Sequence, residues 1–403
     1  MLRQPWIALA CVALALAGCS TLPRSAPPVD LIGTTVIPGF ADIRTPAGWP
    51  SAAMTADLAR SYADESRADF PIGADGLVRY ANLAISGGGP NGAFGSGLLK
   101  GWTDTGKRPV FKIVTGVSTG ALMAPFAFLG PAYDQALHDF YTTNPSRNIF
   151  RRLSLLPQLL GGESIAETGP LRLLIEEHVD EKLLAEVAKA HRAGRRLYIG
   201  TVDLDAQRFV IWNMGLIATS GQPQALDIFR KVMLASASIP VAFPPVLFDV
   251  VTQGNRYDEM HVDGAVGANV FLSGGIFSIA EVRAKHARDP GREDIYVIHN
   301  GQLRPRAEPT RRSLVGIAIR SFDGFTRAGM IGDLFRIYAA TLRDNAGFRW
   351  ITIPDSAEIS GDELFDPVVM NNLYTLGATL GREGPPWETE PPGFRTRGQA
   401  IDP

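Results

Sequence analysis

The sequence predicts an α/β fold whose central, mainly parallel sheet is covered by helices on both faces. Two strand-to-helix junctions and the alternation that follows them predict this class. The glycine-rich turn 87–92 follows an apolar run that ends at Ser86. A second turn, 116–120, stands between the apolar run 111–114 and a helix-forming segment. Helical and strand-like segments then alternate, as in sheets whose parallel strands are joined by covering helices.

The remaining elements are assigned from apolar periodicity and from the residues that end each run. Helices are expected over 119–129, 132–141, 171–178, 181–193 and 228–238, the last of these ending before Pro240. Strands are expected over 196–203, 208–213, 246–252 and 294–299. Beyond residue 300, helices are expected over 314–340 and 367–380, with a strand over 348–354.

Ser118 is the candidate nucleophile because it lies in a G-x-S-x-G motif with Gly116 and Gly120. In a nucleophile elbow the serine occupies a strained turn between a strand and a helix, and only small neighbours fit there. The apolar run before the motif and the helical segment after it supply that context. An ordinary glycine-rich turn is the alternative.

The earlier turn is the candidate oxyanion hole. Backbone amides at a strand-to-helix junction, together with the helix N-terminus, can hold an oxyanion or a phosphate. A flexible turn is the alternative, whereas NAD and P-loop sites are excluded because the required acidic residue and the Gly-Lys-Ser/Thr ending are missing. The predicted hole consists of Gly87, Gly88, Gly89, Pro90, Asn91 and Gly92.

Asp263 is the candidate base, since it precedes Gly264 in a turn where burial would raise the pKa of its carboxyl group. An aspartate that caps its own turn is the alternative. His261 could share a strand face with Asp263, but a packing role is expected. The six histidines show no paired metal-binding spacing, so neither a metal nor another cofactor is expected.

Four ordered blocks of this chain resemble those of the patatin-like phospholipases, namely residues 87–92, 116–120, 235–240 and 263–265. The resemblance covers about residues 77–300. It implies a three-layer fold, a Ser118–Asp263 dyad without histidine, and an oxyanion hole formed by amides around Gly88 and Gly89. The implied activity is hydrolysis of lipid carboxylic esters, of phospholipase A or lysophospholipase type, through an acyl-enzyme. Asn91 stands where many members carry arginine or lysine.

Two other functions stay open. An ordinary α/β-hydrolase would use Ser118, Asp263 and His299 as a triad, in that chain order. A non-catalytic, lipid-binding lipoprotein of the cell envelope would keep the fold without the reaction.

The N-terminus predicts a bacterial lipoprotein. A short basic start, an apolar stretch and the sequence Leu-Ala-Gly-Cys at 16–19 are typical of a signal peptide that is removed before a lipidated Cys19. Ser20 favours the outer membrane, with the protein facing the periplasm. Residues 21–50 are expected to form a semi-extended tether, followed by a helix over 52–68 whose face with Leu58 and Tyr62 packs into the core.

The net charge and the length of the chain limit its possible partners and its division into domains. A net charge of −2 over 403 residues gives no electrostatic case for nucleic acid, and protein partners cannot be named. The basic run 304–312 could touch anionic headgroups, although a solvated linker is the default. Residues 148–169 could form a lid. The predicted division is a signal peptide (1–18), an anchor and tether (19–75), a catalytic domain (76–300), a helical completion (301–384) and an irregular tail (385–403).

Overall fold

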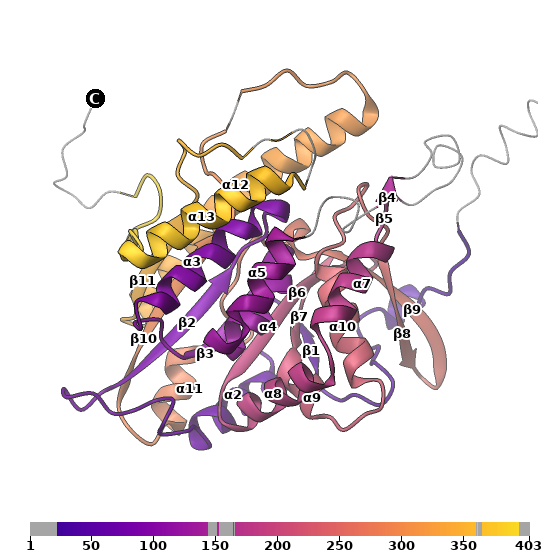
Figure 1. Ribbon diagram of the computed structural model, residues 1–403. Coiled ribbons are helices and arrows are strands. Elements are labelled where there is room, and N and C mark those ends of the chain that lie inside the picture. Colours follow the sequence, from indigo (N-terminus) through magenta and orange to yellow (C-terminus); the bar gives the residue numbers. More distant parts are fainter. Residues whose placement is uncertain are drawn as a thin grey trace, which may run out of the picture.

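The computed structural model describes residues 22–143, 151–152, 164, 166–305, 307–359, 361 and 365–394. Its centre is a twisted sheet with helices on both faces, which confirms the predicted α/β class (Figure 1). The strand order is β1-β7-β6-β3-β2-β10-β11, and β9 also pairs with β6 and with β8. The strands are β1 (Arg44–Pro46), β2 (Val78–Ile85), β3 (Phe111–Val117), β6 (Arg196–Asp203), β7 (Arg208–Asn213), β8 (Val246–Thr252), β9 (Asn255–Asp263), β10 (Gly291–His299) and β11 (Gly347–Thr352).

The five strands from β6 to β11 along the order β6-β3-β2-β10-β11 are parallel, and the remaining strands are antiparallel. Turn length explains the difference. Only residues 204–207 separate β6 from β7, and only Gln253 and Gly254, both with positive φ, separate β8 from β9. Such short turns join antiparallel neighbours, whereas parallel strands need a crossover of a dozen residues or more.

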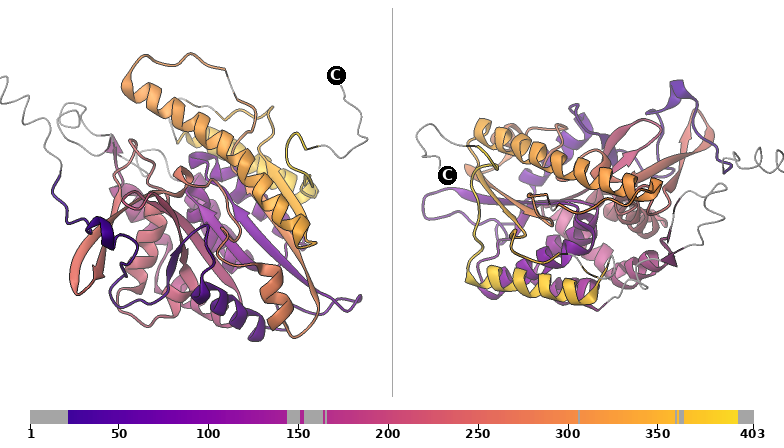
Figure 2. Two further views of the ribbon diagram at one scale, coloured as in Figure 1. Left: turned by 180° about the vertical axis from the view of Figure 1, so that it is seen from behind. Right: turned by 90° about the horizontal axis from the view of Figure 1, so that it is seen from above.

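Two apolar clusters fill the space between the sheet and its helices, one on each face. One cluster lies under α3 (Gly92–Asp104), α4 (Thr119–Leu129), α5 (Asp134–Thr142), α7 (Gly169–His178), α8 (Glu181–Arg192), α9 (Met214–Thr219), α10 (Ala225–Ser236) and α13 (Pro367–Glu383). The other lies under α2 (Ala52–Ala63), α11 (Ile279–His286) and α12 (Leu314–Arg343), which face the viewer in the left panel of Figure 2. Alternate residues of β2 point into opposite clusters, as expected for a strand buried on both faces.

The N-terminal segment differs from a free tether where the structure describes it. Arg24 forms ion pairs with Asp205 and Asp258, and β1 adds an antiparallel edge strand to β7. The apolar side chains of Ile37, Phe40 and Ile43 are buried, which explains why this segment lies against the domain. In α2, Leu58 and Tyr62 are fully buried, so the expected core packing of that helix is confirmed.

The C-terminal helix α13 packs directly on α3 through glycines. A Cβ atom on Gly97 or Gly101 would collide with the backbone of Tyr374 or Ala378, and one on Gly377 would collide with Phe94. Backbones at this distance leave no room for side chains between the helices. The C-terminal segment therefore completes the same domain, and α3 in turn carries the glycine-rich turn. Among the described residues no helix combines the length and apolar character needed to span a bilayer.

Candidate active site

Ser118 lies between β3 and α4 in the strained turn that the motif predicted. The backbone of Ser118 has φ 56° and ψ −124°, and Ser118 is only 5% exposed to solvent. The turn needs glycine on both sides. A Cβ on Gly116 would collide with the carbonyl of Gly120, and one on Gly120 would collide with the carbonyl of Ile85. The elbow is thus packed against the end of the neighbouring strand β2.

Asp263 reaches Ser118 because of strand register. Val117 pairs with Gly200 on β6, and the next residue of β6, Thr201, pairs with Asp263 at the end of β9. Ser118 directly follows β3, and Asp263 is the last residue of β9. Both strands pair with β6, at neighbouring residues, so the two candidate residues lie at the same edge of the sheet. The sequence placed them 145 positions apart, and the sheet brings them together.

The electrostatics of Asp263 suit a base. Burial raises the pKa of its carboxyl to about 7, against the lowering effects of the Ser118 hydroxyl and of the Ala265 amide as hydrogen-bond donors. The Ala265 N–H donates to Oδ1 at 2.8 Å. Oδ2 has no partner of good hydrogen-bond geometry among the described residues, so the serine contact is loose, as is common before substrate binds.

The segment around residue 236 holds the backbone at both groups in place, a role that the sequence did not reveal. The Ser236 hydroxyl accepts a hydrogen bond from the Ser118 amide at 3.0 Å and donates to the Gly200 carbonyl at 2.6 Å. The Asp263 amide donates to the Ser238 carbonyl at 2.9 Å. One helix end thereby fixes the backbone of the nucleophile and of the base.

Most backbone amides of the predicted oxyanion hole already donate hydrogen bonds or are missing. The amides of Gly87, Asn91 and Gly92 already donate to backbone carbonyls, and Pro90 has no N–H. Among the hydrogen bonds of the described chain, the amides of Gly88 and Gly89 donate to nothing. The amide of Thr119, which follows the nucleophile, is also uncommitted there and begins α4. Of the described amides in the predicted run, only those of Gly88 and Gly89 are available to a ligand, together with that of Thr119.

Asn300 and Ser86 support this loop from beneath, and neither was singled out from the sequence. The Asn300 side chain donates to the Ser86 carbonyl at 3.1 Å and accepts from the Gly95 amide at 3.2 Å. A Cβ on Gly88 would collide with the Asn300 carbonyl, and Gly88 has φ 150°, where glycine is favoured. The conformation that frees the Gly88 amide is thus set by the end of β10.

His299 does not complete a triad among the described residues. Its Nδ1 lies 3.0 Å from the Ser86 hydroxyl, and burial together with the charge of Arg327 lowers its pKa to about 4. No contact of the described residues joins its ring to Asp263. A neutral, buried histidine beneath the loop is a structural partner of Ser86.

An apolar pocket opens beside Ser118 and encloses roughly 470 Å³ of space, part of it open to solvent. Its wall contains no charged side chain and comes from helices on one face of the sheet and from the C-terminal segment. The lining residues are Gly89, Ser118, Thr119, Leu122, Phe140, Tyr141, Leu171, Leu174, Ala237, Ile239, Phe243, Phe365 and Met370. Such a wall suits an alkyl chain.

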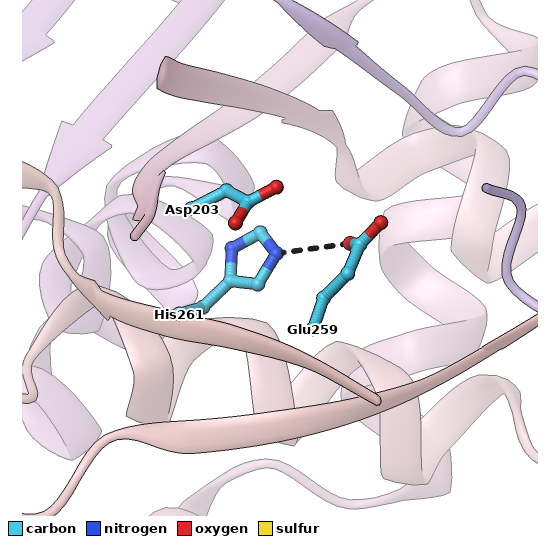
Figure 3. A group of neighbouring side chains, drawn as sticks. All are labelled: Asp203, Glu259 and His261. Carbon is cyan, nitrogen blue, oxygen red and sulfur yellow. Dashed lines mark hydrogen bonds and ion pairs between the residues drawn. The ribbon is translucent and has the colours of Figure 1, made fainter. Parts of the chain in front are cut away.

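Asp203, Glu259 and His261 form the one cluster of the described residues with metal-binding spacing (Figure 3). Arg44 already supplies a positive charge there, since its guanidinium forms an ion pair with Glu259 and lies 3.5 Å from Nε2 of His261. The ring also bonds the Thr201 hydroxyl at 2.9 Å and packs against Trp212 and Phe248. The cluster ties β1 to β9, and the packing role expected for His261 is confirmed.

Several predicted features lie outside the described residues. These are the signal peptide, Cys19, and most of the predicted lid at 148–169. Within that lid segment, the described pairs Arg151–Arg152 (β4) and Ala166–Glu167 (β5) form a small antiparallel ladder.

Comparison with known proteins gives one family. The model of the family described as patatin-like phospholipase matches residues 83–274, an interval that contains the glycine-rich turn, Ser118 and Asp263. A search of solved structures finds, among others, the crystal structure of VipD from Legionella pneumophila, at 11% sequence identity and a TM-score of 0.36. That match covers 78% of this chain and 69% of the other. No curated protein matches the chain.

Proposed function

We propose that this chain is a lipid hydrolase that cleaves carboxylic esters with a Ser118–Asp263 dyad; the match of residues 83–274 to the patatin-like phospholipase model supports this class of reaction. The observation that carries the proposal is the buried Asp263 carboxyl beside the strained serine, with a pKa raised to about 7. A base with that pKa is half ionised near neutral pH and can both accept and return a proton.

The reaction proceeds in two steps. Asp263 takes the proton of the Ser118 hydroxyl while Oγ attacks the ester carbonyl carbon, and the amides of Gly88, Gly89 and Thr119 bind the oxyanion. The leaving alcohol takes the proton from Asp263 as the C–O bond breaks. A water molecule then attacks the acyl-enzyme, gives its proton to Asp263, and the acid leaves as Ser118 regains a proton.

The substrate class follows from the pocket. Its wall is apolar around the position of the acyl group, so we propose a long-chain acyl ester, as in phospholipids and lysophospholipids. We further propose that the enzyme acts in the cell envelope, anchored at the outer membrane through a lipid on Cys19.

The test is active-site labelling of the full chain with a fluorophosphonate. We expect labelling of the wild type and its loss in Ser118→Ala, because the reagent needs an activated serine. Ser96→Ala is the matched control, since Ser96 is equally buried but bonds only a backbone carbonyl.

The same proteins, incubated with a mixed bacterial lipid extract, should release free fatty acids and lysolipids that mass spectrometry identifies. His299→Ala should keep most of the activity; a loss as large as that of Asp263→Asn would favour the triad instead. Folded wild-type protein that neither labels nor hydrolyses would contradict the proposal and favour a lipid-binding protein.

A further inference from the structure

Helix α12 is longer than the sheet that it covers. It leaves the carboxyl edge of β10 and returns to the amino edge of β11, where Gly347 pairs with Asp294. Its 30 residues span about 45 Å, whereas a strand of nine residues spans about 30 Å. One end of the helix must therefore project beyond the sheet.

The projecting end is the N-terminal one. Asp333 accepts a hydrogen bond from the Asn269 amide, and the Asn269 carbonyl accepts one from Gly87, so Asp333 lies at the level of the active-site loop. Among the side chains of α12 that the structure describes, the first fully buried apolar one is that of Met330. Residues 314–328 consequently form about 20 Å of helix that lies beyond that level, at the edge of the sheet where Ser118 follows β3. The left panel of Figure 2 shows this half of the helix extending beyond the sheet.

The projecting half exposes large apolar side chains. Leu314 is 83% exposed, Ile317 53% and Phe325 59%, and their spacing places them on one face of the helix. The other exposed residues of this face are Ser321, Gly324 and Ala328, so it contains no carboxylate. A contiguous apolar strip of this kind marks an interaction surface.

The segment around this strip is rich in arginine, and Arg304 at its start forms an ion pair with Asp355. Between residues 304 and 328 the chain has six arginines and two carboxylates, although the whole chain has a net charge of −2. Arg320 and Arg327 are neutralised by Glu308 and Asp323. Arg311 and Arg312 are exposed and form no ion pair with any described carboxylate. Exposed apolar residues next to unpaired arginines complement the interface of an anionic bilayer.

We propose that residues 307–328 form a docking surface for an anionic phospholipid membrane, with Leu314, Ile317 and Phe325 inserted between headgroups and Arg311 and Arg312 on the phosphates. This surface would turn the opening beside Ser118 toward the bilayer. Only that orientation rests on the proposed function; binding itself does not require hydrolysis.

The test is co-sedimentation of the full chain with vesicles of ether-linked phosphatidylglycerol and phosphatidylethanolamine in equal parts, which the enzyme cannot hydrolyse. All proteins carry Cys19→Ser, so that no N-terminal lipid contributes. We expect Arg311→Glu with Arg312→Glu to weaken binding at least about 25-fold, since each arginine contributes roughly fivefold at an anionic surface. Phe325→Ser should weaken it about tenfold. Vesicles of ether-linked phosphatidylcholine should bind the wild type much less.

The matched controls lie at the opposite edge. Leu342→Ser changes an exposed leucine of the same helix, and Arg292→Glu changes an exposed arginine at the start of β10; neither should affect binding. Hydrolysis of a short-chain soluble ester should be equal in all these proteins, so an inactive enzyme and a failed docking surface give different results. Equal binding by docking and control variants would overturn the proposal. A wild-type dimer that Phe325→Ser dissociates, without vesicle binding, would assign the surface to a second copy.

Discussion

Two buried aspartates, one at each edge of the sheet, have opposite surroundings. At the amino edge, Asp57 of α2 lies 2.6 Å from Nε of Arg196 and accepts a hydrogen bond from Asn213 at 2.8 Å. At the carboxyl edge, Asp263 has no cation beside it, and one of its oxygens has no well-formed hydrogen bond within the described chain. Both residues are almost completely buried.

The pKa values of the two carboxyls differ accordingly. Burial alone would raise the pKa of Asp57, but the hydrogen bond from His191 and the charge of Arg196 lower it well below its usual value. Burial raises the pKa of Asp263 to about 7 because no cation opposes it. The amino edge thus uses an aspartate for stability, whereas the carboxyl edge retains one that stays reactive.

Replacing each aspartate by asparagine should separate the two roles. Asp263→Asn should lower kcat at least about 10³-fold, because it removes the only proposed base, and leave the free energy of unfolding at neutral pH equal or higher. Asp57→Asn should cost about 3–5 kcal/mol of stability by leaving Arg196 unpaired, with normal kcat per folded molecule. Urea denaturation and ester hydrolysis measure both quantities. If either substitution lowered both kcat and the free energy of unfolding, the proposed division between a stabilising Asp57 and a catalytic Asp263 would be wrong.

The contributions of Asp263 and Asp57 to the free energy of unfolding should change with pH in opposite directions. The unfolded Asp263 loses its proton near pH 4, whereas the folded one keeps it to about pH 7. Its contribution is therefore fully present below about pH 4 and is lost as the pH rises to 7, on the order of 4 kcal/mol. The contribution of Asp57, whose folded pKa is lowered, is present above about pH 4 and is lost as the pH falls.

Thermal or urea unfolding of the wild type and the two asparagine variants, carried out between about pH 3 and 8, measures these differences. The stability of Asp263→Asn relative to the wild type should increase with pH. The wild type should lose its advantage over Asp57→Asn in acid. A pH-independent difference for Asp263→Asn would mean that its carboxyl is not shifted, and would weaken its assignment as the base.

The smallest effect is expected at Ser86, a positioning residue beneath the loop. Ser86→Ala removes hydrogen bonds with His299 and with the Asn300 amide. We expect kcat to fall roughly tenfold to a hundredfold while KM changes little, because loosened amides stabilise the oxyanion less. Ser86→Thr, which keeps the hydroxyl, should recover part of kcat. An equal change in KM and kcat, or no recovery, would point to general loosening of the core.

Local signals in the sequence were sufficient to predict the strand-to-helix turn that holds Ser118 and most of the helices and strands. The predicted bounds of α4, β6, β7 and β8 agree with the structure, because each has a clear period and a clear stop. The glycines around Ser118 and the turn at Asp263 are likewise local features.

Long-range contacts could not be predicted from these signals. Antiparallel pairing of β9 with β6 depends on which strands meet, and apolar alternation is the same for either direction. Ser236 bonds Ser118, which is 118 residues away, and Asn300 bonds Ser86, which is 214 residues away, so their own neighbours in sequence give no sign of the role. The amides of Gly88 and Gly89 are free among the described residues because those of Gly87, Asn91 and Gly92 bond carbonyls, and one of these acceptors, Asn269, lies far along the chain.

The close contact between α3 and α13 has a consequence for how this enzyme can be divided. The family match ends at residue 274, yet α13 covers the glycine face of α3, and Phe365 and Met370 line the pocket beside Ser118. A fragment that stops at residue 300 would leave bare backbone in water along α3 and would remove one side of the acyl pocket. A fragment that keeps both the cover of α3 and the wall of this pocket therefore extends through Glu383, the last residue of α13.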